Sequence, residues 1–280
     1  MFKKEIIGLM SGTSLDGLDI VLADFDCIEG QNKFELKHAC TVPYPDMLKK
    51  KIENAESLNH AEFQIISKTI GSFFGEAVNQ FIKDHEISKN NIAAIASHGQ
   101  TILHQPENGF TLQIGCGSTI AYTTGINVIS DFRTLDVIAG GQGAPLAGLF
   151  HKYLNTIINK KLTYLNLGGF ANISRNNNKN IIAYDLCSVN IVLNYLSSIT
   201  GRKFDKDGVI AKSGKLIPNL LSKLNSIEFY SKNYPKSLGI EWVSDNIFPI
   251  INEWLKKSSL ENVMHTYVIH IIKIISSSLT

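Results

Sequence analysis

KEIIGLM (residues 4–10), SGTSLDG (11–17) and LDIVLADF (18–25) follow one another near the start of the chain. The two outer runs are apolar and rich in β-branched residues, which is typical of strands. The middle run has the glycines and hydroxyl side chains of a turn. The sequence therefore predicts two strands joined by a Gly-rich turn.

The predicted turn carries the groups needed to hold a phosphate. Its glycines let the backbone approach a ligand closely, and its N–H groups, with the hydroxyls of Ser11, Thr13 and Ser14, are able to surround an anion. A carboxylate at Asp16 or Asp19 is able to hold Mg²⁺ beside that phosphate. A plain hairpin is the alternative, because neither the P-loop pattern nor G-x-G-x-x-G occurs in this chain.

Helix and strand patterns alternate after this hairpin. Apolar residues recur at spacings of three and four between Ile66 and Phe81, which predicts a core-facing helix. This order indicates an α/β layer fold with at least partly parallel strand pairing. The elements predicted next are strands at 92–99, 110–115 and 126–132 and a helix near 117–124.

A second strand–turn–strand pattern begins near residue 160. LTYLNLGG (162–169) and FANIS (170–174) surround a Gly turn, and a third strand, IIAYD (181–185), precedes a helix at 189–200. Because the chain restarts its opening pattern, we expect a boundary between 130 and 160 and a protein of two lobes.

Composition excludes several classes of protein. The 280 residues are 44% hydrophobic and 19% charged, with a net charge of +2, so a disordered or fibrous chain is excluded. No long basic run marks a nucleic-acid or membrane surface. The four cysteines form no C-x-x-C pair, and no targeting segment is visible, so we expect reduced thiols and a cytoplasmic protein.

The chain contains five motifs that are rich in glycine, hydroxyl or charged residues. In chain order they are GLMSGTSLDGLD (8–19), SHGQT (97–101), DFRTLD (131–136), GGQGAPL (140–146) and NLGGFANIS (166–174). In their order and spacing the chain resembles the anhydro-N-acetylmuramic acid kinase family. The segment PKSLG (235–239) also fits this family. The resemblance covers essentially the whole chain.

The resemblance implies an α/β fold of the sugar kinase/Hsp70/actin, or actin-like ATPase, architecture, with ATP held between two RNase H-like lobes. Residues 1–135 would form the first lobe with its phosphate-binding hairpin, and residues 136–280 the second. Typical members continue for close to another third of this length, so we expect a second lobe that is incomplete and lacks its adenosine-binding part. Exposed apolar surface is then expected on Ile269, Ile271, Ile272, Ile274 and Ile275.

Members of this family hydrolytically open the anhydro ring of 1,6-anhydro-N-acetylmuramic acid and transfer the γ-phosphoryl group of ATP to O6. The products are N-acetylmuramic acid 6-phosphate and ADP, formed in peptidoglycan recycling. The resemblance therefore implies ATP and Mg²⁺ as cofactors and a small amino sugar as substrate. We expect no nucleic-acid or membrane partner, and a homodimer as the commonest kind of assembly.

The resemblance also assigns site residues. Asp185 would be the catalytic base, whereas the residue pattern alone favours a cap of the following helix. Arg133, Gly141 and Gly143 would contact the sugar, and Asp16 would hold the metal. His98 is interpreted as a structural histidine rather than a proton shuttle. The residues implied for the nucleotide are Gly12, Thr13, Ser14, Leu15, Asp16, Gly17, Leu18, Asp19, Gly168 and Gly169.

Two departures from the family pattern leave alternatives open. Asp185–Asn190 reads DLCSVN where members usually have D-T-G-P-G-N, so β-carbons, including that of Val189, replace a flexible backbone. Ile240 follows PKSLG where an Arg is usual. A catalytically impaired, shortened remnant and a non-catalytic sugar-binding module are therefore alternatives to an active kinase.

Overall fold

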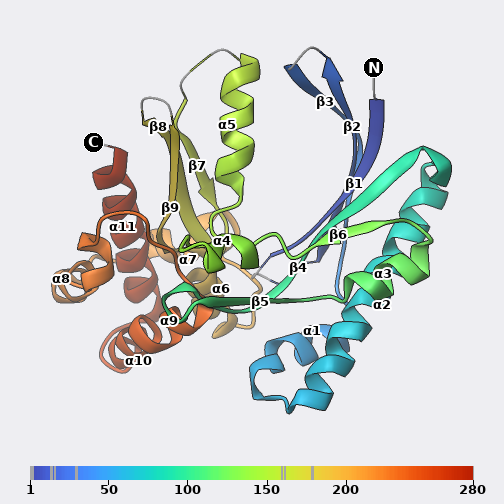
Figure 1. Ribbon diagram of the computed structural model, residues 1–280. Coiled ribbons are helices and arrows are strands. Elements are labelled where there is room, and N and C mark those ends of the chain that lie inside the picture. The colour runs from blue at the N-terminus through green and yellow to red at the C-terminus, as the bar shows by residue number, and fades with distance from the viewer. Residues whose placement is uncertain are drawn as a thin grey trace. The chain divides into compact units, whose positions relative to one another are not determined.

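The chain forms a mixed α/β structure. The computed structural model describes residues 3–12, 15, 17–28, 31–158, 160, 162–177 and 180–279. It divides into two compact units, Met1–Gly140 and Gly141–Thr280, and each unit has its own hydrophobic core. Figure 1 shows the helices and strands of both units.

A six-stranded mixed sheet forms the first unit, with the order β3-β2-β1-β4-β5 and with β6 also paired to β4. The strands β1 and β2 pair antiparallel as the predicted hairpin, while β1 and β4 pair parallel. Strand β3 was not predicted, and it lies at the edge of the sheet against β2. The strands are β1 (Lys3–Ser11), β2 (Leu18–Ile28), β3 (Gln31–Val42), β4 (Ile92–Gln105), β5 (Phe110–Ile114) and β6 (Val128–Ser130).

Helix α2 covers one face of this sheet and confirms the predicted helix. It begins with a capping box in which the Asn59 side chain accepts the N–H of Glu62 and the Glu62 carboxylate accepts the N–H of Asn59. Its buried stripe packs on alternate strand residues such as Ile7 and Leu9. The helices are α1 (Asp46–Glu53), α2 (His60–Asp84), α3 (Gly117–Thr124) and α4 (Thr134–Ile138), with 3₁₀ turns at Ala55–Ser57, Lys89–Asn91 and Pro106–Asn108.

Two glycines let α3 approach α2 closely. A Cβ atom on Gly71 would lie 2.7 Å from the carbonyl oxygen of Cys116, and one on Gly75 would lie 2.7 Å from the Cβ of Thr123. The two helices lie side by side in Figure 1. Since the glycines are four residues apart, both lie on the same face of α2.

The second unit is built on a three-stranded antiparallel sheet, β7-β8-β9. The strands are β7 (Tyr164–Leu167), β8 (Phe170–Asn177) and β9 (Asn180–Ser188), which confirm the predicted strands near 162–169, 170–174 and 181–185. The helices are α5 (Ala147–Ile158), α6 (Asn190–Ser198), α7 (Val209–Ser213), α8 (Pro218–Asn225), α9 (Ile240–Asn246), α10 (Phe248–Leu255) and α11 (Leu260–Leu279), with 3₁₀ turns at Lys206–Gly208 and Glu228–Ser231.

Helices lie on both faces of this sheet. The core on one face joins Ile173 of β8 to Tyr267 of α11. On the other face, the His151 ring of α5 stacks on Tyr164 of β7 with the ring centres 4.2 Å apart. Among the described residues, no helix has the length and apolar character needed to cross a membrane.

The expected exposure of the last helix is only partly correct. Ile271 is buried in the core of the second unit, so the expectation was wrong for that residue. Ile274 and Ile275 pack against the same core, whereas Ile272 is 51% exposed. The helix therefore turns most of its isoleucine side chains toward its own unit.

Replacing Gly75 with alanine is expected to destabilise the first unit. Alanine improves helix propensity by about 1 kcal/mol, but forcing its methyl group against Thr123 costs about 1–3 kcal/mol. We expect a net loss in the free energy of unfolding, measured by urea denaturation. Gln64→Ala, at an exposed position of the same helix, is the control and should change that free energy little. Equal stability of Gly75→Ala and wild type would contradict this close packing.

Acidification is expected to destabilise the second unit through His270. This side chain is fully buried on α11, its Nδ1 lies 2.6 Å from Oδ1 of Asn225, and burial lowers its pKa to about 4. Between pH 6.5 and 4 the unfolded chain binds a proton here that the folded chain does not, so stability falls as the pH falls. The loss approaches about 3 kcal/mol at pH 4.

His270→Asn removes this titration while keeping a side-chain donor for Asn225. We expect thermal denaturation from pH 7 to pH 4 to show a shallower fall in the free energy of unfolding for this variant than for wild type. His60→Asn, at an exposed position, is the matched control and should follow the wild-type curve. If the free energy of unfolding fell equally with pH in His270→Asn and wild type, His270 would not be a source of the acid sensitivity.

Candidate functional site

The β1–β2 turn is tightly fixed at both ends. The Leu15 N–H donates to the Gly12 carbonyl oxygen at 3.2 Å, and Leu15 adopts φ 53°. A Cβ on Gly17 would lie 2.5 Å from the Val42 carbonyl oxygen, so only glycine fits there. Leu18 is fully buried, so its backbone alone is able to meet a ligand. Of the predicted turn residues, Thr13, Ser14 and Asp16 lie outside the described residues.

A buried polar network anchors the base of this turn. The Ser11 hydroxyl, at the end of β1, lies 2.6 Å from the Tyr44 hydroxyl and donates to the side-chain carbonyl oxygen of Gln100. Burial raises the pKa of Tyr44 to about 12, so its hydroxyl keeps its proton. The network ties the turn to β4, where the SHGQT motif lies.

Asp19 is the described carboxylate of the hairpin. It lies on β2 with an exposed side chain, and its Oδ1 accepts a hydrogen bond from the Thr41 hydroxyl at 2.5 Å. Within the described ranges, no group of three His, Cys, Asp or Glu side chains forms a metal site.

A β-bulge interrupts the pairing of β1 with β4 at the SHGQT motif. Leu9 pairs with Ser97 and Ser11 pairs with Gln100, so two residues of β4 oppose the single residue Met10. The bulge contains Gly99, which has φ 73° and no room for a Cβ because the Ile114 carbonyl oxygen would lie 2.7 Å away. Such bulges redirect a side chain and are common beside active sites.

The bulge directs His98 to Arg133. The His98 Nδ1 lies 2.8 Å from the Gly99 carbonyl oxygen, and Nε2 accepts the Arg133 Nε–H at 2.9 Å. Only the neutral ring with its proton on Nδ1 satisfies both contacts. Burial, followed by the charge of Arg133, lowers the pKa of His98 to about 4, so the ring is neutral at physiological pH.

In the second unit, Asp185 lies within β9 beside a second bulge. Ala171 pairs with Cys187 and Asn172 pairs with Asp185, so Leu186 is an extra residue in β9. Because of this residue, Leu186 and Cys187 both contribute to the same core. Asp185 lies on the opposite face of the sheet and is 5% exposed.

A row of polar side chains crosses the sheet at Asp185. Asn166 of β7 pairs with Asn172 of β8, which pairs with Asp185 of β9, and directly opposed residues share a face. The Asn166 side-chain amide donates to Oδ1 of Asn172 at 2.9 Å. This face also carries Tyr164, on which α5 packs through His151.

The PKSLG segment holds Asp185 by two hydrogen bonds. The Leu238 N–H donates to Oδ2 of Asp185 at 2.9 Å, and the Asp185 N–H donates to the Lys236 carbonyl oxygen at 3.1 Å. The Ser237 hydroxyl donates to Oε1 of Gln142 at 3.1 Å. Through this segment, Gln142, which lies between the predicted sugar residues Gly141 and Gly143, is brought near the predicted base.

Gly168 and Gly169 form the turn between β7 and β8. Their carbonyl oxygens accept the N–H groups of Asn190 and Val189 at 3.1 and 2.8 Å, at the start of α6. A Cβ on Gly168 would have only an ordinary contact, 3.8 Å from the Phe170 carbonyl oxygen. One residue lies between Asn166 and Gly168 and two lie between Gly169 and Asn172, so this turn is about 7–10 Å along the strands from the row at Asp185.

The structure corrects two expectations about Asp185. The strand does not end there but continues to Ser188, and α6 begins after Val189, so Asp185 is not the cap of that helix. Val189 has φ −123°, a value in the range that a β-branched residue ordinarily adopts. The residues that replace the glycines and proline of the family pattern instead fill the core, as Leu186, Cys187 and Val189 show.

Sequence reasoning missed several residues of these sites. It gave no role to Asn172 or Leu238, it included Gln142 only within the range 140–145 expected to line the sugar cleft, and it treated His98 as structural only. All four residues lie inside the quoted motifs, so the motifs mark the right segments of the chain. Their contacts join segments up to 95 residues apart, and such contacts cannot be read from local patterns.

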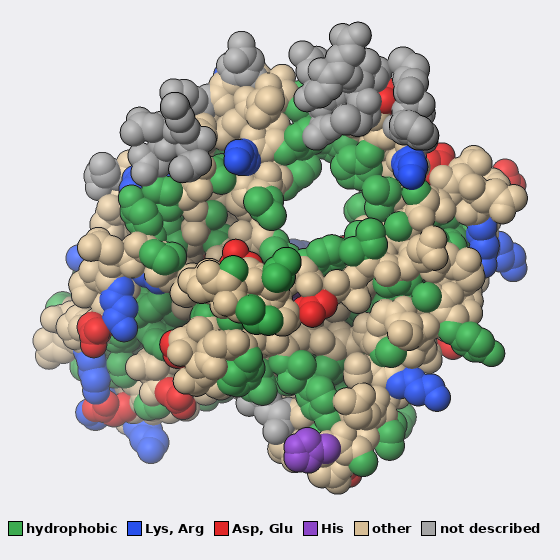
Figure 2. Space-filling view, viewed as in Figure 1, with side chains coloured by type: hydrophobic (Ala, Val, Ile, Leu, Met, Phe, Trp, Pro, Cys, Tyr) green, Lys and Arg blue, Asp and Glu red, His purple; other side chains and the backbone are tan. Residues whose placement is uncertain are grey.

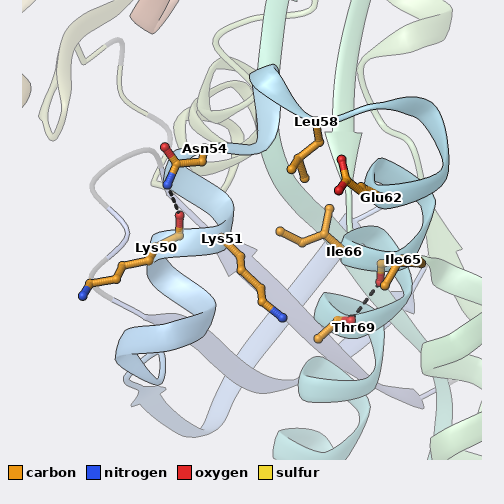
Figure 3. A pocket seen from close by; sticks show the side chains of 8 residues that line it. All are labelled: Lys50, Lys51, Asn54, Leu58, Glu62, Ile65, Ile66 and Thr69. Carbon is orange, nitrogen blue, oxygen red and sulfur yellow. Dashed lines mark hydrogen bonds between the residues drawn. The ribbon is translucent and has the colours of Figure 1, made fainter.

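A cavity of about 400 Å³ lies between α1 and α2. Figure 3 shows the Lys51 side chain extending into it, while the Lys50 side chain points away. The Asn54 amide donates to the Lys50 carbonyl oxygen, and the Thr69 hydroxyl to the Ile65 carbonyl oxygen. The Lys50 and Ile65 carbonyl oxygens thus have partners within the protein, and no predicted site residue lines the cavity.

Basic side chains do not gather on the visible face. Figure 2 shows the described Lys and Arg side chains there as separate positions, with Asp and Glu side chains between several of them. Among the described residues, Glu253 forms ion pairs with Lys223 and Lys257 at 2.7 and 2.5 Å.

Comparisons with known proteins agree with the motifs. A relative from Shewanella baltica named anhydro-N-acetylmuramic acid kinase is 37% identical over 284 residues, which cover 96% of this chain and 76% of the relative. A relative of the same name from Shewanella oneidensis is 37% identical over 290 residues, covering 98% and 78%. YeaZ from Pseudomonas aeruginosa is 10% identical and covers 66% of this chain and 67% of its own, but its TM-score of 0.24 carries no argument about the fold.

The profile of one family, described as anhydro-N-acetylmuramic acid kinase, matches residues 4–277. This match spans nearly the whole chain and includes the hairpin turn, the His98–Arg133 pair and the row at Asp185. The chain therefore belongs to the anhydro-N-acetylmuramic acid kinase family.

Proposed function

We propose that this chain is an ATP-dependent kinase that opens the anhydro ring of 1,6-anhydro-N-acetylmuramic acid and phosphorylates O6. The products are N-acetylmuramic acid 6-phosphate and ADP, and the reaction serves cell-wall recycling. Besides family membership, the observation that carries the proposal is the buried carboxylate of Asp185, held by the Leu238 N–H beside a β-bulge.

The reaction needs one carboxylate at the anomeric carbon. Asp185 takes a proton from a water molecule as the water oxygen attacks C1, and the bond between C1 and the bridging oxygen breaks. That oxygen, now O6, attacks the γ-phosphorus of ATP, and ADP leaves with the electrons of the broken bond. The Leu238 N–H fixes the orientation of the carboxyl group, which general base catalysis requires.

The nucleotide is assigned to the two glycine turns. We place the ATP phosphates at the turn from Gly12 to Asp19 and at Gly168–Gly169. The open space around Gly168 supports this, because packing within the protein does not itself demand glycine there. In this proposal the two units are the RNase H-like lobes of an actin-like ATPase architecture.

Kinases of this kind use ATP with a divalent metal ion, and we propose Mg²⁺. Asp16, or Asp19 at the end of the same turn, would hold the ion, since Mg²⁺ prefers carboxylate oxygens. When bound, the ion offsets the negative charge of the phosphates during transfer. The exposed carboxylate of Asp19 on β2 fits this donor chemistry.

The sugar is assigned to Arg133, Gly141 and Gly143. The guanidinium of Arg133 offers planar, bidentate donors for a polar or anionic group of the substrate. Gly143 has φ 63° and directly follows Gln142. The Gln142 side chain accepts a hydrogen bond from the Ser237 hydroxyl, in the same PKSLG segment that binds Asp185. These contacts support a sugar position next to Asp185.

Asp185→Asn tests both the function and the base. Wild-type protein with ATP, a divalent metal and the anhydro sugar is expected to form a product heavier by one water and one phosphoryl group, detected by mass spectrometry. Asparagine still accepts the Leu238 N–H but cannot take the proton, so kcat should fall by about 100-fold or more. Asp245→Asn, at an exposed position of α9, is the control and should keep wild-type activity.

The experiment distinguishes a failure of the proposed kinase function from a failure of the assignment of Asp185 as the base. A folded wild-type protein without this product would refute the kinase function. Normal turnover by Asp185→Asn alongside an active wild type would refute only the assignment of the base.

Gly168→Ala tests the second phosphate turn. The fold accommodates the methyl group, so the free energy of unfolding should change by no more than about 0.5 kcal/mol. A methyl group facing the phosphates should raise KM for ATP about tenfold, a loss of about 1.4 kcal/mol, and leave KM for the sugar unchanged. Steady-state kinetics and thermal denaturation measure both effects. An unchanged KM for ATP would remove Gly168 from the nucleotide site.

A further inference from the structure

We infer that His98 is a positioning residue of the sugar site, whose neutral Nε2 holds the Arg133 guanidinium in the orientation in which it meets the substrate. This inference rests on the proposed function for the identity of the substrate. The His98–Arg133 hydrogen bond at 2.9 Å and the bulge that creates it do not depend on that function.

The bulge in β4 sets the direction of the His98 side chain and thereby its contact with Arg133. In a regular strand successive side chains alternate between faces, whereas the extra residue at His98–Gly99 breaks this alternation. The conformation is fixed because Gly99 has φ 73° and any larger residue would meet the Ile114 carbonyl oxygen. The His98 side chain is 7% exposed, so its direction is set by packing as well.

Two hydrogen bonds of the His98 imidazole, to Gly99 and to Arg133, give each ring nitrogen a different role. Nδ1 donates to the Gly99 carbonyl oxygen at 2.8 Å, which fixes the rotation of the ring. Nε2 is then the acceptor that faces the Arg133 Nε–H. Since Nε2 is engaged by a cation, a role for His98 as the base that activates water is not supported.

Holding Nε–H fixes the plane of the whole guanidinium. The group is rigid and planar, so one bond at Nε sets the directions of the remaining N–H donors. Ordering a long side chain before binding avoids an entropy cost that corresponds to about a 2- to 10-fold change in affinity. We therefore expect His98 to act on KM for the sugar rather than on KM for ATP.

Glutamine and asparagine separate positioning from structural support. The side-chain oxygen of glutamine reaches the place of Nε2, whereas the side-chain amide of asparagine reaches only that of Nδ1. His98→Gln is able to keep the acceptor for Arg133, and His98→Asn is able to keep only the bond to Gly99. We expect KM for the sugar near the wild-type value in His98→Gln and about fivefold higher in His98→Asn, with KM for ATP unchanged in both.

Other kinetic outcomes overturn the inference. Full activity of His98→Asn together with loss in His98→Gln would show that only the Gly99 contact matters. Equal loss, or no loss, in both variants would show that the acceptor at Nε2 has no special role. In an Arg133→Ala background His98→Asn should have no further effect on KM for the sugar, because interacting residues are not additive. A persisting effect there would also overturn the inference.

A second measurement does not need activity. The chain has three arginines, Arg133, Arg175 and Arg202, so its NMR spectrum contains three Nε–H groups, and Arg133→Lys assigns one of them. We expect that Nε–H to exchange slowly with solvent in wild type and His98→Gln, and rapidly in His98→Asn. Rapid exchange in wild type would refute the His98–Arg133 bond. A protected signal in an inactive protein would instead refute the kinase function and leave the bond in place.

Discussion

A regular strand cannot direct two neighbouring side chains to the same face, and both candidate sites depend on places where this rule is locally broken. In β9, the extra residue Leu186 lets Leu186 and Cys187 both enter the core, while Asp185 stays on the opposite face. In β4, the extra residue at His98–Gly99 brings His98 to Arg133. Bulges in otherwise regular sheets thus place the Asp185 carboxylate and the His98 imidazole that binds Arg133.

The electrostatics of Arg133 explain why a histidine suits this place. A carboxylate partner would orient the guanidinium but would also offset its charge, which the substrate is proposed to meet. A neutral imidazole accepts the Arg133 Nε–H without adding a negative charge beside the guanidinium. Burial and the adjacent guanidinium both lower the pKa of His98, to about 4, so the ring is neutral at physiological pH.

Local sequence patterns predicted the helices and strands that bury one apolar face. They failed for elements whose structure depends on pairing with residues distant in sequence. The periodicity of α2 and the β-branched runs of β1 and β2 were sufficient because each buries an apolar face. Strand β3 was missed because no side chain from Lys33 to Val42 is buried, and only its pairing with β2 makes it a strand. The family motifs located Asp185, but its bond to Leu238, 53 residues later, is a property of the fold.

The altered segment after Asp185 shows how the fold accommodates lost glycines. Side chains at 186, 187 and 189 pack into the core, so the β-carbons do not face the polar row at Asp185. Ser188 completes the arrangement: its hydroxyl and that of Tyr267 lie 2.7 Å apart, and the Tyr267 hydroxyl donates to the Ser188 carbonyl oxygen at 2.9 Å. Tyr267 is fully buried on α11, so this helix fixes the end of β9. This packing behind the strand fixes the end of β9 three residues beyond Asp185, whose own hydrogen bonds run to Leu238 and Lys236.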